Sequence, residues 1–368
     1  MEPMPQIVAH GTLDYAELAS LGLSPDEVHV FSSNINPYGP PPAVVQAVQA
    51  AVKPTTISRY PDRLAMELRR AVARLHQVPE EAVLAGNGTA DIMWLIALLF
   101  APDARVAIVS PTFGEYENVA SLVDAQVIQP CHPGWERRED GRYTPGATTL
   151  DELGEALAEQ TPRLIFLCNP NNPTGHHLSP DELERLHSFA PESIWVVDEA
   201  YAEFTPTPWS ASRWIDQGDW IILRSMTKDF SLAGLRVGYA VGSPHLIQAM
   251  QVAQPPWNVN TLAQIAGTTA LDNLAWRAET TARLRQETEA LRQALQAAGM
   301  APLPTSTNFF LLPVEDATQV RQALVQQRIL VRDCTSFGLP NYIRIATQRP
   351  EENRLLVEAL QALQGDAS

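Results

Sequence analysis

The stretch RSMTKDFSLAGLRVGYAVG, residues 224–242, places one lysine among small and apolar residues. Lys228 stands three residues after Ser225 and eight before Arg236, and the apolar run 220–223 comes directly before the stretch. A short apolar run of this kind is typical of a strand that is buried on both faces of a sheet. We therefore expect 220–223 to be a strand and Lys228 to lie just beyond its carboxyl end.

Other strands and helices alternate with this one along the middle of the chain. Helix-like segments separate four further short apolar runs, which predict strands at 105–110, 163–168, 194–197 and 237–241. One helix start is explicit, since Ser179 is a hydroxyl N-cap, Pro180 takes the first helical position and Glu182 completes a capping box. Such alternation favours an α/β fold with a mostly parallel sheet.

The pattern changes after residue 255. Residues 261–299 predict a long helix with a break near Asn273, and β-rich segments with two flanking helices follow at 308–312 and 342–346. The first forty residues look extended and rich in proline, so they must lie against another part of the chain. We expect an N-terminal arm packed with the small domain, a large cofactor-binding α/β domain and a smaller C-terminal α+β domain, over residues 1–40, 41–255 and 256–368.

Composition limits the classes of protein to which the chain can belong. A formal net charge of -16 over 368 residues disfavours binding to nucleic acid or to an anionic membrane. The chain has three cysteines, Cys131, Cys168 and Cys334. They are not spaced like metal ligands, and an odd number cannot all pair in disulfides, which indicates a reducing compartment. We expect a cytoplasmic protein, because no signal-peptide pattern opens the chain and no apolar stretch is long enough to span a bilayer.

Polar side chains follow three of the predicted strands at the point where each strand ends. They offer an amide, a carboxylate, a phenol, a hydroxyl and an amine, from Asn172, Asp198, Tyr201, Ser225 and Lys228. Ligands of open parallel sheets bind at these carboxyl ends. Gly86 and Gly88 also precede a predicted apolar helix, whose first backbone amides can bind an anion.

Each of these features alone has an ordinary explanation. The segment 169–175 is typical of a turn. Asp198 alone could be a helix cap, and Lys228 alone could be a solvated surface charge. The glycines complete neither a G-x-G-x-x-G nor a P-loop pattern, so the sequence indicates neither a dinucleotide site nor an ATP site.

In combination, these residues fit an aromatic aldehyde cofactor with a phosphate tail. Such a cofactor needs an amine for its aldehyde, a carboxylate for its ring nitrogen, donors for its phenolic oxygen and a cradle for its phosphate. A desolvated lysine with a lowered pKa suits the aldehyde. We assign Lys228 to the aldehyde, Asp198 to the ring nitrogen, and Asn172 and Tyr201 to the phenolic oxygen. Ser225 and Arg236 are assigned to the phosphate, together with the backbone amides of Gly88, Thr89 and Ala90. Phe113 is expected to stack on the ring.

In this order, the motifs resemble those of the fold type I pyridoxal-phosphate enzymes, the aminotransferase class I/II family. The resemblance covers nearly the whole chain and rests on Asn172-Pro173-Thr174-Gly175, Asp198-x-x-Tyr201, Ser225-x-x-Lys228 with Arg236, and a late Arg344. It implies pyridoxal 5′-phosphate as the cofactor and Lys228 as the amine that binds it. It also implies a homodimer in which Tyr60, from the segment Arg59-Tyr60-Pro61-Asp62, reaches the cofactor phosphate of the neighbouring subunit.

Several segments resemble one branch of this family, the threonine-phosphate decarboxylases of cobalamin biosynthesis. They are residues 31–40, 111–116, 256–260 and 332–335, together with His10-Gly11. The chain departs from this branch at Thr12 and Leu13, where the branch often reads His-Gly-Gly-Asn, and Tyr201 is more typical of the sister histidinol-phosphate aminotransferases. The resemblance implies a phosphorylated amino acid or amino alcohol as substrate, bound by His10, Asn34, Arg332 and Arg344.

The sequence is compatible with two reactions. The bond to Cα that breaks is the one that lies perpendicular to the cofactor plane, and residue types alone do not show which bond has this orientation. Loss of the carboxylate gives a decarboxylase, whereas loss of the α-proton to Lys228 as general base gives a transaminase. We expect decarboxylation of L-threonine O-3-phosphate to (R)-1-amino-2-propanol O-2-phosphate. The alternative is a histidinol-phosphate aminotransferase or a related enzyme that uses glutamate and 2-oxoglutarate. A non-catalytic effector domain is disfavoured, since residues 1–40 hold no helix-turn-helix pattern and the net charge opposes DNA binding.

Overall fold

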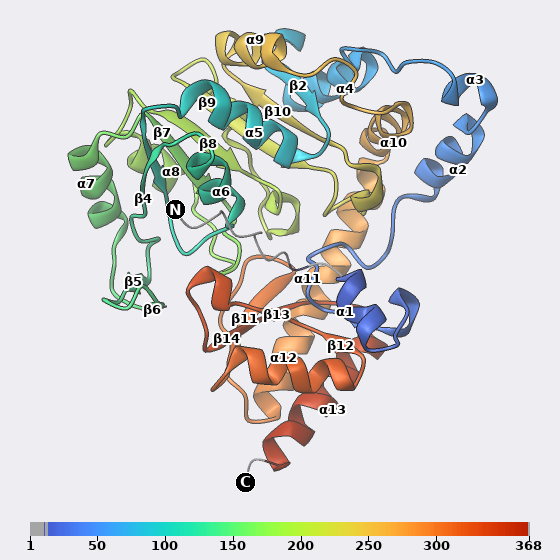
Figure 1. Ribbon diagram of the computed structural model, residues 1–368, viewed down its shortest axis with the longest axis vertical. Helices are drawn as coiled ribbons and strands as arrows, with labels where there is room; N and C mark the ends of the chain where they lie inside the picture. Colours follow the sequence, from blue (N-terminus) through green and yellow to red (C-terminus); the bar gives the residue numbers. More distant parts are fainter. Residues whose placement is uncertain (1–10, 12–13, 367–368) are drawn as a thin grey trace.

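A seven-stranded sheet forms the centre of the larger of two lobes (Figure 1). The structure is a computed structural model, and it describes residue 11 and residues 14–366. In the strand order β2-β10-β9-β8-β7-β3-β4, only β10 is antiparallel to its neighbours, which confirms the expected mostly parallel α/β sheet. The strands are β2 Val83–Gly86, β3 Arg105–Ile108, β4 Gln126–Ile128, β7 Leu164–Cys168, β8 Ile194–Asp198, β9 Trp220–Ser225 and β10 Gly238–Gly242.

Helices cover both faces of this sheet, because its central strands carry apolar side chains on both sides. In β7, for example, Phe166 packs into the core on one face, whereas Ile165 and Leu167 pack into the core on the other. The first face is covered by α5 Thr89–Phe100, α6 Glu115–Ser121 and α9 Pro244–Ala253. The second face is covered by α2 Pro42–Ala51, α4 Met66–His76, α7 Leu150–Gln160, α8 Pro180–His187 and α10 Thr261–Leu271. The short helix α3, Pro54–Ile57, follows α2.

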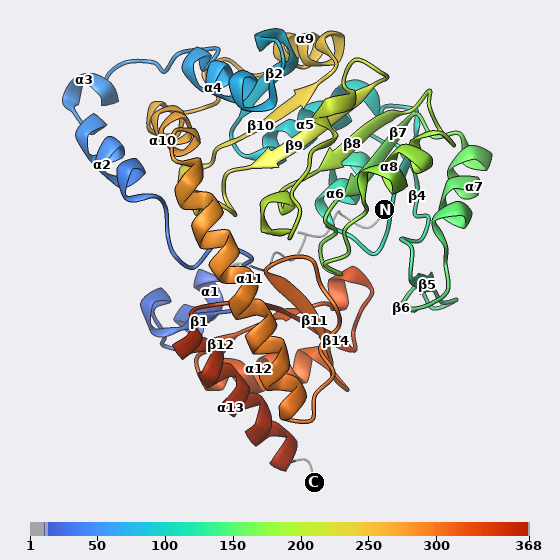
Figure 2. The same ribbon diagram turned by 180° about the vertical axis from the view of Figure 1, so that it is seen from behind.

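Helix α11, Leu274–Ala297, runs from the larger lobe into the smaller one (Figure 2). There it packs with α12 Ala317–Gln326 and α13 Pro350–Asp366 around a core that includes Leu291 and Phe310. The sheet of this lobe is antiparallel in the order β11-β14-β13, with β11 Phe309–Pro313, β13 Arg332–Asp333 and β14 Tyr342–Ala346. Two smaller pairs join β1 His29–Val30 to β12 Ile329–Leu330 and β5 Trp135–Arg137 to β6 Tyr143–Pro145. Within residues 14–366, no helix is both long and apolar enough to cross a membrane.

The predicted secondary structure is confirmed for the main elements. Helix α8 begins after Ser179, and Ser179 and Glu182 form the expected capping box. The helix predicted for 261–299 is broken at Asn273, which separates α10 from α11. The predicted β-rich segments correspond to β11 and β14.

The described part of the first forty residues is less extended than we expected. Asp14 accepts hydrogen bonds from the backbone N–H groups of Ala16 and Glu17 and so begins helix α1, Tyr15–Ser20. A 3-10 turn follows at Pro25–Glu27, and β1 then pairs with β12 of the smaller lobe. The domain boundaries at residues 40 and 255 stay predictions. Helix α10 lies after the second boundary, yet it packs on α2 and α4 of the larger lobe.

Candidate active site

A cavity of about 770 Å³ lies where the carboxyl ends of β7, β8 and β9 meet the smaller lobe. The linker between β1 and α2 lines it as well, so the cavity draws on both lobes and on the segment that joins them. Most of the predicted site residues line this one cavity. They are Asn34, Thr89, Ala90, Phe113, Asn172, Asp198, Tyr201, Ser225, Lys228, Arg236, Arg332 and Arg344.

Two of the predicted residues that the structure describes do not line the cavity. Gly88 lies just behind it, against the guanidinium of Arg236. Tyr60 is 78% exposed and stacks on Trp257, with the ring centroids 4.4 Å apart. His10 lies outside the described residues. The trans role expected for Tyr60 and the substrate contact expected for His10 therefore stay predictions.

Lys228 lies in the loop after β9, and the linker between the lobes holds this loop from behind. The backbone N–H of Asn36 donates to the carbonyl oxygen of Lys228 at 2.9 Å, and the Asn36 amide donates to the carbonyl oxygen of Asp229 at 3.2 Å. Burial, with the charge of Arg344 nearby, lowers the pKa of Lys228 to about 8. A neutral amine, which is the form that attacks an aldehyde, is therefore well populated near pH 8.

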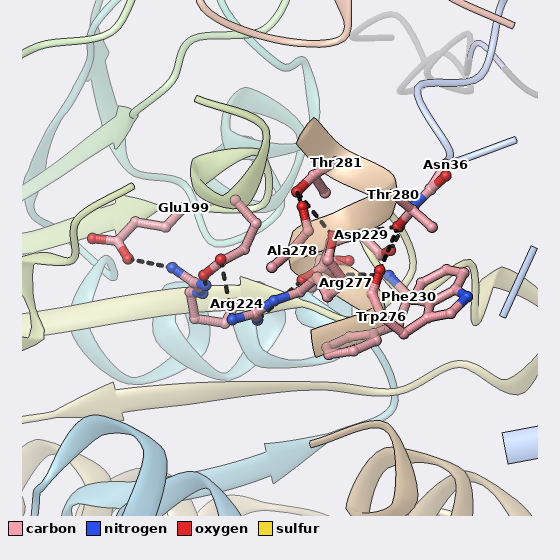
Figure 3. A network of polar contacts seen from close by, with 12 residues as sticks. Asn36, Glu199, Arg224, Asp229, Phe230, Trp276, Arg277, Ala278, Thr280 and Thr281 are labelled. Atoms are coloured by element: carbon pink, nitrogen blue, oxygen red, sulfur yellow. Dashed lines mark hydrogen bonds and ion pairs between the residues drawn. The ribbon is translucent and has the colours of Figure 1, made fainter. Parts of the chain in front are cut away.

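A buried ion network lies behind the lysine loop (Figure 3). Arg224 pairs with Glu199 at 3.0 Å and also with Glu203. Arg277 of α11 pairs with Glu203 at 3.1 Å and with Asp229 at 3.4 Å. Because Asp229 directly follows the lysine and α11 enters the smaller lobe, the network connects the lysine loop to the helix that joins the two lobes.

Asp198 ends β8 at the edge of the cavity and is 4% exposed. One carboxylate oxygen accepts a hydrogen bond from the backbone N–H of Ala200 at 3.0 Å, and the other accepts one from the hydroxyl of Tyr116 at 2.8 Å. Burial raises the pKa of Asp198, whereas these two hydrogen bonds and the charge of Lys228 lower it. A carboxylate in this setting suits a protonated pyridine nitrogen.

The start of α5 and Arg236 form a cradle for an anion. Gly88 has a φ of 79°, and a Cβ at this position would meet Nη2 of Arg236 at 2.7 Å, so glycine allows the close approach. Thr89 and Ala90 open the helix, whose first N–H groups have no partner within it, and Ser225 lines the same cavity. A guanidinium, a hydroxyl and a helix N-terminus form a donor set for phosphate. With Lys228 and Asp198, this set fits pyridoxal 5′-phosphate.

Two arginines from the smaller lobe line the opposite part of the cavity. Arg332 of β13 and Arg344 of β14 lie directly opposite each other in the antiparallel register. Arg344 donates to Oδ1 of Asn172 and to the Ser32 carbonyl at 2.7 Å, and its Nε is buried without a hydrogen-bond partner among the described residues. Burial, with the charge of Arg344, lowers the pKa of Arg332 to about 10. Two neighbouring buried cations favour an anionic ligand.

Tyr201 provides a neutral hydroxyl in the same cavity. Its oxygen accepts a hydrogen bond from the Asn34 amide at 3.2 Å, and its ring packs edge-on against Phe309, with the centroids 4.8 Å apart. Burial raises the pKa of Tyr201 to about 12, so the phenol keeps its proton at neutral pH. The hydroxyl can therefore donate to a ligand oxygen while it accepts from Asn34.

This combination of sheet, lysine loop, carboxylate and phosphate cradle defines a pyridoxal-phosphate enzyme of fold type I. The family model for aminotransferase class I and II matches residues 26–360, and the chain belongs to this family. The family expected from the sequence motifs is confirmed, and the cofactor is pyridoxal 5′-phosphate.

Relatives of this chain include enzymes of both branches. A histidinol-phosphate aminotransferase of Symbiobacterium thermophilum is 35% identical over 91% of this chain and 90% of its own length. A threonine-phosphate decarboxylase of Salmonella typhimurium is 36% identical over 96% of this chain and 95% of its own length. The crystal structure of L-threonine-O-3-phosphate decarboxylase from Porphyromonas gingivalis superimposes with a TM-score of 0.78 at 27% identity, over 91% of this chain and 99% of that one. The comparisons therefore support the family and leave the particular reaction to be proposed.

Sequence reasoning assigned no role to three residues that the structure brings to the site. Tyr116 hydrogen-bonds Asp198, the Ser32 carbonyl accepts from Arg344, and Glu115 is buried in the cavity wall. The spacing of Phe113 and Tyr116 within one segment could have indicated that both side chains reach the same site. A backbone carbonyl such as that of Ser32 has no signal in residue type, so only the fold could reveal it.

Proposed function

We propose that this chain is a decarboxylase that converts L-threonine O-3-phosphate to (R)-1-amino-2-propanol O-2-phosphate. The observation that carries the proposal is the pair of buried guanidinium groups of Arg332 and Arg344 in the cavity wall. A phosphate dianion can accept hydrogen bonds from two guanidinium groups at once. The likeness to a threonine-phosphate decarboxylase over nearly the full chain is in agreement with this assignment.

The chemistry of decarboxylation favours binding of the phosphate, rather than the carboxylate, by these arginines. An ion pair with the carboxylate is lost when CO2 leaves, so it would stabilise the bound substrate more than the transition state. An ion pair with the phosphate stays the same throughout the reaction and orients the substrate at no such cost. We therefore infer that Arg332 and Arg344 hold the substrate phosphate and leave the carboxylate free to lie perpendicular to the cofactor ring.

The remaining residues of the chain have roles that follow from their positions. When bound, pyridoxal 5′-phosphate supplies an electron sink for the bond to Cα that breaks. Lys228, with its pKa of about 8, can hold the cofactor aldehyde and later return a proton to Cα after CO2 has left. Asn172 and Tyr201 orient the cofactor oxygen, and Phe113 lines the wall where the ring would stack.

Transamination of histidinol phosphate is the second candidate. Several histidinol-phosphate aminotransferases are 31–35% identical to this chain, and these relatives favour it. Glu115, an acidic residue in the cavity wall, would suit an imidazole group. In this reaction Lys228 would remove the α-proton as general base, and 2-oxoglutarate would accept the amino group.

We also propose that two copies of the chain form the active unit. Tyr60 is 78% exposed and Ile57 is 75% exposed, so apolar side chains are exposed in α3 and in the loop that follows it. In a homodimer these side chains would be covered, and Tyr60 would reach the cofactor phosphate of the neighbouring subunit. If the product is aminopropanol phosphate, the reaction belongs to the assembly of the cobalamin side chain.

A direct comparison of two substrates tests the proposed function. The purified protein, loaded with pyridoxal 5′-phosphate, is given phosphothreonine alone or histidinol phosphate with 2-oxoglutarate. We expect CO2 from the first mixture, with kcat/KM roughly 100-fold above that for glutamate formation in the second. Glutamate formation without CO2 release would replace the decarboxylase with the aminotransferase.

A binding experiment tests which anion Arg344 holds. The reaction product carries a phosphate but no carboxylate, so it separates the two contacts. Loss of a charged hydrogen bond weakens binding by roughly 10- to 100-fold. We expect Arg344→Gln to weaken binding of aminopropanol phosphate and of phosphothreonine by the same factor. Weakened binding of phosphothreonine alone would assign Arg344 to the carboxylate and would favour the aminotransferase.

A further inference from the structure

Tyr116 lies between the two protein groups that would contact the cofactor ring. Its hydroxyl donates to Oδ2 of Asp198 at 2.8 Å, and its ring meets that of Phe113 edge-on, with centroids 5.6 Å apart at 87°. A third contact holds the ring from the sheet, since it stacks on Phe166 with centroids 5.1 Å apart at 9°. The side chain is fully buried, so water cannot take over the hydrogen bond if the hydroxyl is lost.

The carboxylate of Asp198 depends on its hydrogen bonds because it is buried. The backbone N–H of Ala200 binds one oxygen, and Tyr116 is the side chain that binds the other. Lys228 and Arg224 add favourable charge, whereas Cys168 is a buried thiol without charge at neutral pH. Without the donor at Oδ2, a buried carboxylate takes up a proton more readily and is free to rotate about its Cβ–Cγ bond.

We propose that Tyr116 is a positioning residue that keeps Asp198 ionised and aimed at the ring nitrogen of the cofactor, while its perpendicular ring contact holds Phe113 in place for stacking. Each carboxylate oxygen has two lone pairs, so Asp198 can serve Tyr116, Ala200 and the ring N–H together. This role holds whichever reaction follows, because both decarboxylation and transamination need a protonated ring nitrogen as electron sink. It is thus independent of the proposed substrate.

The test uses the holoenzyme of the Tyr116→Phe variant, which keeps the ring and both aromatic contacts and loses only the hydroxyl. The protein is loaded with pyridoxal 5′-phosphate labelled with ¹⁵N in its ring, and the ¹⁵N NMR shift is followed from pH 6 to pH 9. We expect a protonated ring nitrogen throughout this range in the wild type. In the variant we expect the proton to be lost within the range, and cofactor affinity to fall about 10-fold.

Tyr239→Phe is the matched control. Tyr239 is also buried in the larger lobe and also makes one hydroxyl hydrogen bond to a side chain, to Nε2 of His76 at 3.0 Å. This variant should lower the melting temperature and leave the ring-nitrogen signal as in the wild type. If Tyr116→Phe likewise lowers only the melting temperature, with the ring nitrogen protonated throughout, the proposed role of Tyr116 is overturned.

Discussion

Replacement of Lys228 by methionine should make the cofactor-free protein more stable at neutral pH while it removes activity. Lys228 is half-buried in the wall of the cavity, and this burial, with the charge of Arg344 nearby, lowers the pKa of its amine from 10.5 to about 8. The charged amine is thus disfavoured in the folded protein relative to the unfolded chain, where it is hydrated. A difference of this size corresponds to about 3 kcal/mol of folding free energy, and a methionine of similar length does not incur this cost.

The difference in unfolding free energy between Lys228→Met and the wild type should depend on pH. Below pH 8 both the folded and the unfolded protein carry the proton, and the full cost is present. Between pH 8 and 10.5 the folded protein has lost the proton and the unfolded chain still holds it, so wild-type stability rises relative to that of the variant. The difference between the two proteins should therefore be largest at pH 7 and close to zero near pH 10.5.

Urea unfolding of both cofactor-free proteins, at one protomer concentration and at several pH values, measures this difference. The chain has only two lysines, and Lys53, which is exposed, provides the control. Lys53→Met should leave the free energy of unfolding unchanged at each pH. A Lys228→Met variant that is no more stable than the wild type at pH 7 would refute the inference that the buried amine is disfavoured in its charged form.

The other predictions concern the substrate arginine, the ion network and the dimer. Arg344→Lys should lower kcat/KM roughly 10- to 100-fold, because an ammonium cannot replace the forked guanidinium, and unchanged steady-state kinetics would contradict this. Arg277→Met should lower the free energy of unfolding by about 3 kcal/mol, because Glu203 and Asp229 lose a buried partner. Urea titrations measure this difference, and a change near zero would show that the ion network does not stabilise the fold. At a cofactor concentration that loads the wild type but not Tyr60→Phe, refolding equal amounts of Tyr60→Phe and the inactive Lys228→Met should give about a quarter of wild-type activity, since half of the dimers are mixed and each holds one intact site only if Tyr60 acts in trans. No gain over Tyr60→Phe alone would contradict this.

The sequence was most informative where short apolar strands end in polar residues. The runs that predicted β7, β8 and β9 are buried on both faces, so their period and composition left little choice of structure. Parallel strands bring their carboxyl ends together, and this rule alone brought Asn172, Asp198 and Lys228 to one site. The helix start at Ser179 was equally local, since a capping box depends on residues three apart.

Features that depend on distant parts of the chain could not be predicted in the same way. The ion network joins Glu199, Arg224 and Arg277, which come from three separate elements, and no local pattern marks such a pairing. Helix α1 was missed because the proline-rich composition of the first forty residues hid the N-cap formed by Asp14. Tyr116 belongs to a segment that resembles a family motif, yet its hydrogen bond to Asp198 appears only in the folded chain, where the Tyr116 ring stacks on Phe166 of β7.

The most direct test of the proposed decarboxylation is an NMR measurement in D2O. Wild-type protein with pyridoxal 5′-phosphate is mixed with L-threonine O-3-phosphate, without any 2-oxo acid, and followed by ¹H and ³¹P spectra. Loss of CO2 followed by uptake of one solvent deuteron predicts (R)-1-amino-2-propanol O-2-phosphate with a single deuterium at its amino-bearing carbon. Unchanged phosphothreonine, in a sample that makes glutamate from histidinol phosphate and 2-oxoglutarate, would contradict the account.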